Sequence, residues 1–316
     1  MTQYGLTLSS EEHTPRHLVE MATTAEQAGF DFVSISDHFH PWITAQGHSP
    51  FVWSVLGAIA EATEHVEVGV GVSCPTFRLN PVVSAQAAAT TACLLPDRFT
   101  WGVGSGEALN EHVTGEPWPT AQVRLSMLEE AIDVIRDLWT GESITHRGNH
   151  YTVEDARLFD LPENPPPLVV SAFADDSARL AAQKGDGLWT SGANGEVIDV
   201  FRGAGGEGPV WAQLTVCWDP DEEKARRRAH EIWPNTALPG QLAQDLRTVL
   251  HFEQAVKLVS EDDVAAEVPC GPEADPILER MGEMEKVGVD HIYLHQIGDP
   301  TSGFIDFWEQ ELRPAL

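Results

Sequence analysis

Short runs of apolar and β-branched residues alternate along the chain with longer segments in which apolar residues recur every three or four positions. The first pattern predicts buried strands, and the second predicts amphipathic helices. Strands are expected at residues 3–8, 31–36, 66–72, 99–103, 168–172, 187–190, 210–217 and 290–295. This alternation predicts an α/β fold with a parallel sheet, and eight strands are the number of a closed (β/α)8 TIM barrel.

Helical spacing of apolar residues fills most of the intervals between these strands. Helices are expected at residues 15–28, 81–93, 123–139, 176–184, 222–233, 276–287 and 304–312. Two turn-rich stretches, at about 141–167 and 234–260, interrupt the alternation. Because insertions of this length often cover the mouth of a barrel, we expect residues 1–316 to form one domain with both insertions near its active site.

The charge of the chain narrows its possible partners. Its 19 basic and 49 acidic residues give a net charge of −30, which repels nucleic acids and anionic membranes. The basic residues include only four lysines, a bias that favours a halophilic protein whose self-repulsion is screened by concentrated salt. The alternative is an acidic protein from a GC-rich genome, in which arginine replaces lysine.

Targeting and cysteine patterns favour a cytoplasmic location. Residues 1–9 lack the charged and apolar regions of a signal peptide, and no apolar run is long enough to cross a bilayer. The four cysteines, Cys74, Cys93, Cys217 and Cys270, are far apart in sequence and form no Cys-x-x-Cys pair. We expect reduced thiols, with neither a disulfide framework nor a metal site.

Polar and aromatic residues crowd the carboxyl ends of four predicted strands, where a barrel carries its active site. These clusters lie at residues 9–13, 36–42, 74–78 and 104–111. The second cluster contains His38, which titrates near neutrality and can accept the proton of an alcohol as a hydride leaves the same carbon. Trp42 can supply a flat apolar wall and an indole N–H donor. Alternatively, His38 caps a turn and Trp42 fills the barrel mouth.

The cluster at 104–111 begins with Gly104-Ser105-Gly106, whose flexible backbone allows close approach of a planar ring. Glu107 follows directly, and a bound ring that excludes water would raise the pKa of its carboxyl so that it could donate a proton. The alternative is a helix N-terminal carboxylate that is stabilised by the helix dipole.

Small or hydroxylated residues end the fifth and sixth strands and could bind a phosphate. Small side chains would let a phosphate reach the amides at the start of the next helix, although acidic Asp175 and Asp176 lie beside it. Hydroxyl and amide donors after the sixth strand could reach the same phosphate. The candidate cofactor-binding residues here are Ser171, Ala172, Thr190, Ser191 and Gly192.

Segments 36–42, 75–81 and 102–111 closely resemble the coenzyme F420-dependent glucose-6-phosphate dehydrogenase family of the luciferase-like superfamily. The resemblance extends from Tyr4 to the last predicted helix. It implies a homodimeric barrel that binds a small-molecule substrate and coenzyme F420, a deazaflavin whose phosphate and oligoglutamate tail extend toward solvent.

The resemblance also implies roles for individual residues. It implies that His38 is the base, that Trp42 steadies the intermediate, that Glu107 is an acid near the cofactor and that Glu11 lies at the substrate end. The further positions that it implies are cofactor contacts at Asp37, Gly106 and Asn110, and a non-proline cis peptide between Gly71 and Val72 that supports the ring.

This chain departs from the family where a sugar phosphate would bind. Sugar-phosphate members carry a lysine after the sixth strand, where this chain has Ala193 and Asn194, and residues 264–268 contain no base in place of a second lysine. A phosphate dianion bound without cations would lose its strongest contacts. We therefore expect an uncharged or weakly charged alcohol or carbonyl substrate in place of glucose 6-phosphate.

Three alternatives stay open at the level of sequence. One is that Arg280, Lys257 or Arg247 supplies the missing cation from elsewhere. The second is an FMN-dependent monooxygenase on the same barrel, because flavin and deazaflavin rings share a shape. The third is a catalytically silent cofactor-binding protein, which the intact catalytic residues disfavour.

The chain also departs from the family where the cofactor phosphate would bind. The family has a Gly-Gly pair there, and this chain has Phe173-Ala174.

Overall fold

Eight parallel strands close into a barrel in the computed structural model, which describes residues 2–301 and 303–316. Around the barrel the strands follow the order β1-β10-β9-β8-β7-β4-β3-β2, which confirms the predicted (β/α)8 fold. Each strand begins and ends within one residue of its predicted range. The strands are β1 Gln3–Leu8, β2 Phe32–Ile35, β3 Glu67–Ser73, β4 Phe99–Val103, β7 Leu168–Ser171, β8 Gly187–Ser191, β9 Val210–Val216 and β10 His291–Gln296.

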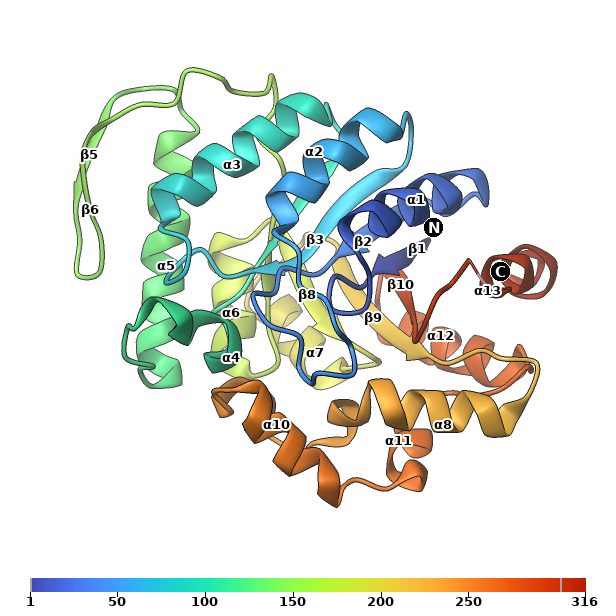
Figure 1. Cartoon of the computed structure of the whole chain (residues 1–316). Coiled ribbons are helices and arrows are strands. Elements are labelled where there is room, and N and C mark those ends of the chain that lie inside the picture. The colour runs from blue at the N-terminus through green and yellow to red at the C-terminus, as the bar shows by residue number, and fades with distance from the viewer. Residues whose placement is uncertain (1, 302) are drawn as a thin grey trace.

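Helices surround the barrel on its outer side, and the two chain ends lie near each other (Figure 1). Thr14 caps the first helix and Asn80 caps the third, each followed by a proline that suits the first helical position. The principal helices are α1 Pro15–Gln27, α2 Val52–Ala62, α3 Pro81–Leu94, α5 Ala121–Leu138, α6 Asp175–Lys184, α7 Gly195–Gly203, α8 Glu222–Ile232 and α12 Asp275–Lys286.

Sequence reasoning missed α2 and α7. The first is apolar on most of its surface and lacks a side-chain cap at Phe51, so its helical period is weak. The second begins at Gly195, and the Asn194 side chain makes no capping hydrogen bond. The predicted final helix is present as α13 Phe304–Phe307 followed by a π-helical turn, η4 Trp308–Leu312, and a 3-10 turn, η5 Arg313–Ala315.

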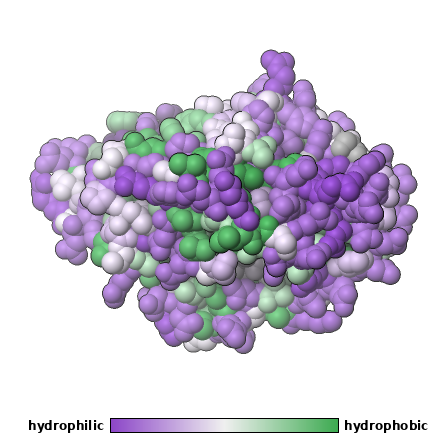
Figure 2. All heavy atoms as spheres, turned by 60° about the horizontal axis from the view of Figure 1, so that its bottom comes forward, coloured by the Kyte–Doolittle hydropathy of each residue, from purple (hydrophilic) through white to green (hydrophobic). Residues whose placement is uncertain are grey.

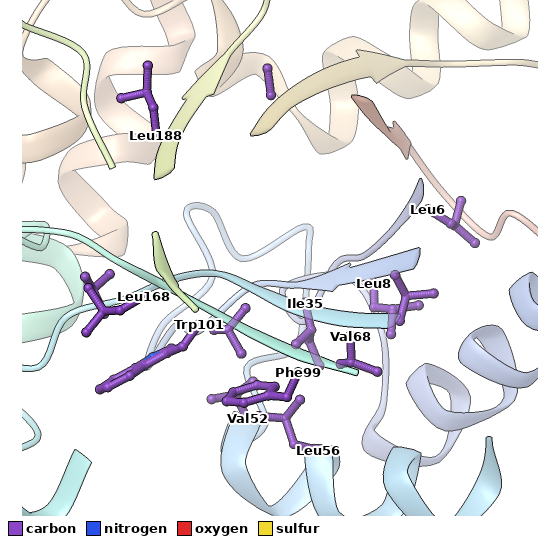
Figure 3. Packing of buried hydrophobic residues seen from close by; sticks show 14 of the residues in the cluster. Leu6, Leu8, Ile35, Val52, Leu56, Val68, Phe99, Trp101, Leu168 and Leu188 are labelled. Atoms are coloured by element: carbon purple, nitrogen blue, oxygen red, sulfur yellow. The ribbon is translucent and has the colours of Figure 1, made fainter. Parts of the chain in front are cut away.

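Apolar side chains pack between the barrel and its helices. Figure 3 shows Phe99 of β4 beside Val52 and Leu56 of α2. Trp101, which is fully buried, contacts Trp53 with ring centroids 5.7 Å apart. This layer fixes the strands whose carboxyl ends carry the site.

Aromatic rings from β8, β9 and β10 pack together inside the barrel. Trp189 and Trp211 stack with centroids 4.9 Å apart, and the Trp189 indole donates to the Tyr293 hydroxyl at 2.5 Å. A Cβ atom on Gly69 or Gly71 would lie 3.0 or 2.4 Å from the Trp189 ring, so these glycines of β3 make room for it. The interior is therefore closed at one end and open at the carboxyl ends of the strands.

The two predicted insertions lie in different places. Residues 141–167 contain a hairpin of β5 Ile144–Arg147 and β6 Thr152–Ala156, which runs outside α5 (Figure 1). Residues 234–260 were expected to be turn-rich and form short helices at the bottom of the view in Figure 1. These and the helix that follows are η2 Pro234–Ala237, α9 Leu242–Asp245, α10 Val249–Ala255, η3 Val256–Leu258 and α11 Glu261–Glu267.

Within residues 2–301 and 303–316, no helix is both long enough and apolar enough to cross a bilayer. Figure 2 shows the face that includes the bottom of Figure 1: most of it is hydrophilic, and apolar side chains gather near its middle.

Candidate active site

A cavity of about 620 Å³ opens at the carboxyl ends of the barrel strands. It has the size of a small-molecule or cofactor site. Of the site residues predicted from the sequence, all except Ala172 and Gly192 line it. Those that line it are Glu11, Asp37, His38, Trp42, Gly71, Val72, Gly106, Glu107, Asn110, Ser171, Thr190 and Ser191.

His38 lies at the centre of the polar part of this cavity. Its Nε2 is 3.3 Å from Glu11 Oε1 and 3.5 Å from Glu107 Oε2, while its Nδ1 is 3.1 Å from the backbone oxygen of His40. A protonated ring can therefore donate from Nδ1 to the backbone and from Nε2 to a carboxylate. Burial lowers the pKa of His38, but the charges of Glu11 and Glu107 outweigh burial and raise the pKa above its ordinary value.

The two carboxyl groups beside His38 have different surroundings. Burial raises the pKa of Glu11, but the His38 charge and the 2.6 Å hydrogen bond from Ser36 Oγ bring it below its ordinary value. Burial also raises the pKa of Glu107, and with the charge of Glu11 it outweighs the His38 charge and the 3.0 Å hydrogen bond from Asn110 Nδ2, so this pKa stays above its ordinary value. Two carboxyl groups with pKa values pushed apart suit a charge stabiliser and a proton donor, respectively.

Asn110 ties the strand ends together. Its Oδ1 accepts from the backbone N–H groups of Phe39 at 2.9 Å and His40 at 3.2 Å. Its Nδ2 donates to Glu107 and lies 3.1 Å from His38 Nδ1. The loop after β2 and the short helix α4 Ala108–Glu111 after β4 are thus held in one arrangement.

Trp42 forms an apolar wall next to the histidine. Its ring centroid is 4.9 Å from that of His38. It also packs edge-to-face with Phe252 of α10, with ring centroids 5.1 Å apart. Trp233, from the end of α8, also lines the cavity, and its indole donates to Glu12 Oε1 at 2.5 Å. The segment after α8 therefore contributes directly to the substrate side of the site.

Three glycines, Gly71, Gly104 and Gly106, line another part of the cavity. The Gly71–Val72 peptide is cis, as the resemblance implies. A Cβ atom on Gly104 would lie 3.0 Å from Val72, and one on Gly106, whose φ is +80°, would lie 2.6 Å from Cys74 Sγ. A larger residue at Gly104 or Gly106 would therefore crowd these neighbours, and glycine leaves the backbone accessible at this part of the cavity.

Asp37 belongs to a buried charge network that the sequence did not reveal. Its Oδ1 accepts from Arg78 Nη2 at 2.8 Å, and Arg78 Nε lies 3.8 Å from Glu111 Oε1. Burial raises the pKa of Glu111 to about 7, although Arg78 opposes this. Asp37 Oδ2 is buried without a partner among the described residues, so the side chain retains one free acceptor at the cavity.

Several lining residues were not among the predicted site residues. Trp189, Gln213 and Tyr293 line the cavity from strand interiors. Side chains alternate across a strand, so Ser191, which was predicted, implies that Trp189 points the same way. Trp233 had no comparable signal, because its place depends on how the chain returns after α8.

The cavity lining is rich in carboxyl groups. Within the described part of the chain no lysine or arginine lines the cavity. Arg280, one of the cations considered from the sequence, donates a hydrogen bond to the backbone oxygen of Ala266 at 3.3 Å. Residues 141–167 contribute nothing to the lining that the structure describes, so the expectation that this insertion covers the mouth was wrong. The carboxylates in the lining belong to Glu11, Asp37, Glu107, Glu111 and Asp176.

Comparison with known proteins shows similarity over nearly the whole chain. A family model described as luciferase-like monooxygenase matches residues 1–291. A protein of Tsukamurella paurometabola named F420-dependent glucose-6-phosphate dehydrogenase is 34% identical over 331 residues, with 99% of this chain and 98% of the relative covered. A protein of the same name from Beutenbergia cavernae is 35% identical, with 100% and 98% covered.

Solved structures agree with these matches. An F420-dependent secondary alcohol dehydrogenase, solved in complex with an F420-acetone adduct, has a TM-score of 0.90 and 30% identity, covering 98% of this chain and 97% of the other. A coenzyme F420-dependent tetrahydromethanopterin reductase from Methanopyrus kandleri has a TM-score of 0.79 at 19% identity, with 99% of each chain covered, which is a likeness of fold.

Proposed function

Because this chain belongs to the luciferase-like monooxygenase family, in the group of the F420-dependent glucose-6-phosphate dehydrogenases, we propose that its cavity transfers a hydride between coenzyme F420 and an alcohol or carbonyl compound. The protein is an F420-dependent oxidoreductase of the luciferase-like class. The single observation that carries the proposed chemistry is His38 between Glu11 and Glu107, in reach of both.

The residues present suit a deazaflavin. The backbone at Gly71, Gly104 and Gly106 has no Cβ atoms, so a planar ring could lie against it, and the free Asp37 Oδ2 can accept a hydrogen bond from the ring system. When bound, F420 supplies a ring carbon that takes or gives a hydride. Further contacts to the cofactor are proposed for Val72, Asn110, Ser171, Ala172, Thr190, Ser191 and Gly192.

The proton steps belong to three side chains. In alcohol oxidation His38 takes the hydroxyl proton at Nε2, and the negative charge of Glu11 stabilises the imidazolium that results. Glu107 is the proton donor, because burial raises the pKa of its carboxyl. Since Asn110 donates to Oε2 of Glu107, Oε1 is the oxygen left to exchange that proton. Trp42 excludes water beside His38.

The substrate side is suited to an uncharged molecule. Phosphate binding relies on charge-assisted hydrogen bonds, and the described lining supplies carboxylates in place of cations. Ala193 and Asn194, where sugar-phosphate members have a lysine, are absent from this lining. An unphosphorylated alcohol or its carbonyl product, held between Trp42 and Trp233, is therefore proposed as substrate.

Steady-state kinetics in concentrated salt, with F420 as acceptor, test this assignment. The kcat/KM for unphosphorylated secondary alcohols should exceed that for glucose 6-phosphate by at least about a hundredfold, the cost of losing charge-assisted phosphate contacts. Efficient oxidation of glucose 6-phosphate would overturn the assignment. Its loss in Arg280→Ala would then identify the residue that replaces the family's lysine.

We further propose that the enzyme is a halophilic, cytoplasmic homodimer of one-domain chains. Phe51 at the start of α2 and Val83 and Leu94 on the neighbouring α3 are half-exposed, and a second copy could cover them. Light scattering in molar salt should give twice the chain mass, and a monomer mass at micromolar concentration would contradict the dimer.

A further inference from the structure

Two cysteines that are far apart in sequence meet at the carboxyl end of β9. Cys217 and Cys270 form an isolated parallel β-bridge. The Cys217 N–H donates to Pro269 O at 2.9 Å, and the Gly271 N–H donates to Cys217 O at 3.1 Å. Residues paired in a bridge project their side chains to the same side of the sheet, so the two thiols are neighbours.

The two thiols have complementary environments. Cys217 is fully buried with its Sγ 3.8 Å from Ile297 O, whereas Cys270 is partly exposed with its Sγ 3.2 Å from Val268 O. A side-chain hydrogen bond with Cys217 lowers the pKa of the Cys270 thiol, and nearby Arg226 contributes against the effect of burial. The same hydrogen bond, together with burial, raises the pKa of Cys217. Cys270 is therefore the accessible nucleophile of the pair.

We propose that Cys217 and Cys270 are a thiol modification site that forms an intramolecular disulfide by exchange with a low-molecular-weight disulfide. The Cys270 thiolate attacks one sulfur of the reagent, forms a mixed disulfide and releases one thiol. Cys217 then loses its proton, attacks Cys270 Sγ and releases the second thiol. Two protein thiols are oxidised by two electrons in total, and one reagent disulfide is reduced to two thiols.

The disulfide would join the two ends of a chain segment that lines the cavity. Residues 218–269 lie between the two cysteines and contain α8 and the helices through α11, including Trp233 and Gln244 of the cavity lining. A disulfide at the base of this segment reduces the conformational freedom of the unfolded chain. The modification therefore stabilises this segment without touching His38 or its carboxylates.

Intact-mass and thiol analysis of the folded, full-length protein with oxidised glutathione as the reagent test the proposal. In a Cys93→Ser background, which removes the exposed thiol of α3, the protein should lose about 2 Da and two free thiols. Peptide mapping should find Cys217 linked to Cys270, and Tm should rise by about 5 °C. The matched Cys93→Ser/Cys270→Ser variant should show neither change.

An unchanged mass would overturn the proposal, and so would a stable mixed disulfide with glutathione on Cys270, because it would mean that Cys217 cannot resolve it. If the double variant does not fold, peptide mapping of the unmutated chain after the same treatment still shows whether Cys217 is linked to Cys270. Reversal by a dithiol reductant, with return of the original mass and Tm, is expected.

Discussion

At the scale of single residues, the chemistry depends on how the environment of each carboxyl differs. Glu11 is buried and receives a 2.6 Å hydrogen bond from Ser36, whereas the partly exposed Glu107 accepts a 3.0 Å hydrogen bond from the Asn110 amide. The sequence identified His38, Trp42 and both glutamates because strand ends of a barrel carry chemistry. It could not identify the partners of Arg78, since a buried ion pair between the loops after β2 and β3 depends on tertiary contacts.

His38→Ala should lower kcat by about 10²–10⁴ because a general base is lost, while the affinity for F420 stays within about tenfold. Stopped-flow reduction of F420 and equilibrium fluorescence titration measure the two effects. His40→Gln is the matched control: it lies in the same loop, its side chain bonds Leu109 O at 3.1 Å, and it is absent from the described cavity lining. Unchanged turnover in His38→Ala would show that His38 is not the base.

Glu11→Gln should move the acid limb of the pH profile of alcohol oxidation to lower pH. Oxidation requires neutral His38, whose pKa in the folded protein is raised by Glu11 and Glu107 against the effect of burial. Removing one negative charge lowers that pKa, so kcat/KM should rise with pH about one unit earlier. Carbonyl reduction requires the protonated ring, so its activity falls as pH rises, and this falling limb should also move to lower pH.

Glu12→Gln is the control for this shift. Glu12 is adjacent in sequence and bonds His295 at 3.0 Å, but it does not lie beside His38. In Glu12→Gln the acid limb of the pH profile should lie at the same pH as in the unmutated enzyme. A limb in Glu11→Gln that stays in place or moves to higher pH would contradict the role given to Glu11.

At the scale of elements, the eight strands were predictable because parallel strands buried on both faces give compact apolar runs between turn residues. The place of each insertion was not. Residues 141–167 lead into the amino end of β7, which is the end of the barrel away from the cavity. Residues 234–260 come after β9 and α8, and the carboxyl end of β9 lies on the side of the cavity. Helices were predicted at 222–233 and at 276–287, both between β9 and β10. The sequence did not indicate which of them packs on the barrel, and in the structure α12 packs on β9.

Phe252→Ala tests whether α10 supports the substrate wall. Phe252 is fully buried and meets Trp42, so its removal should cost about 3–5 kcal/mol of stability and leave Trp42 free to shift. We expect KM for alcohols to rise about tenfold or more, since one misplaced wall of a site weakens orientation. Leu250→Ala on the same helix, at a side chain that is 59% exposed, should change neither stability nor KM. An unaltered KM in Phe252→Ala would disprove the support role.

At the scale of the whole molecule, the net charge of −30 is the dominant property. Stability, measured as Tm, should rise as KCl increases toward about 1 M, where the Debye length falls to about 3 Å and repulsion between carboxylates is screened. Sucrose at equal osmolality is the control, because it stabilises by exclusion without screening charge. A protein that is most stable in dilute buffer, or that responds equally to sucrose, would contradict the halophilic account.

The most direct test of the central claim is an equilibrium fluorescence titration of the purified protein with F420 and, separately, with FMN in molar salt. A cavity built for a deazaflavin should bind F420 with a Kd of about 1 μM or lower and FMN at least about tenfold more weakly. A clear preference for FMN would contradict the assignment of this protein as an F420-dependent oxidoreductase.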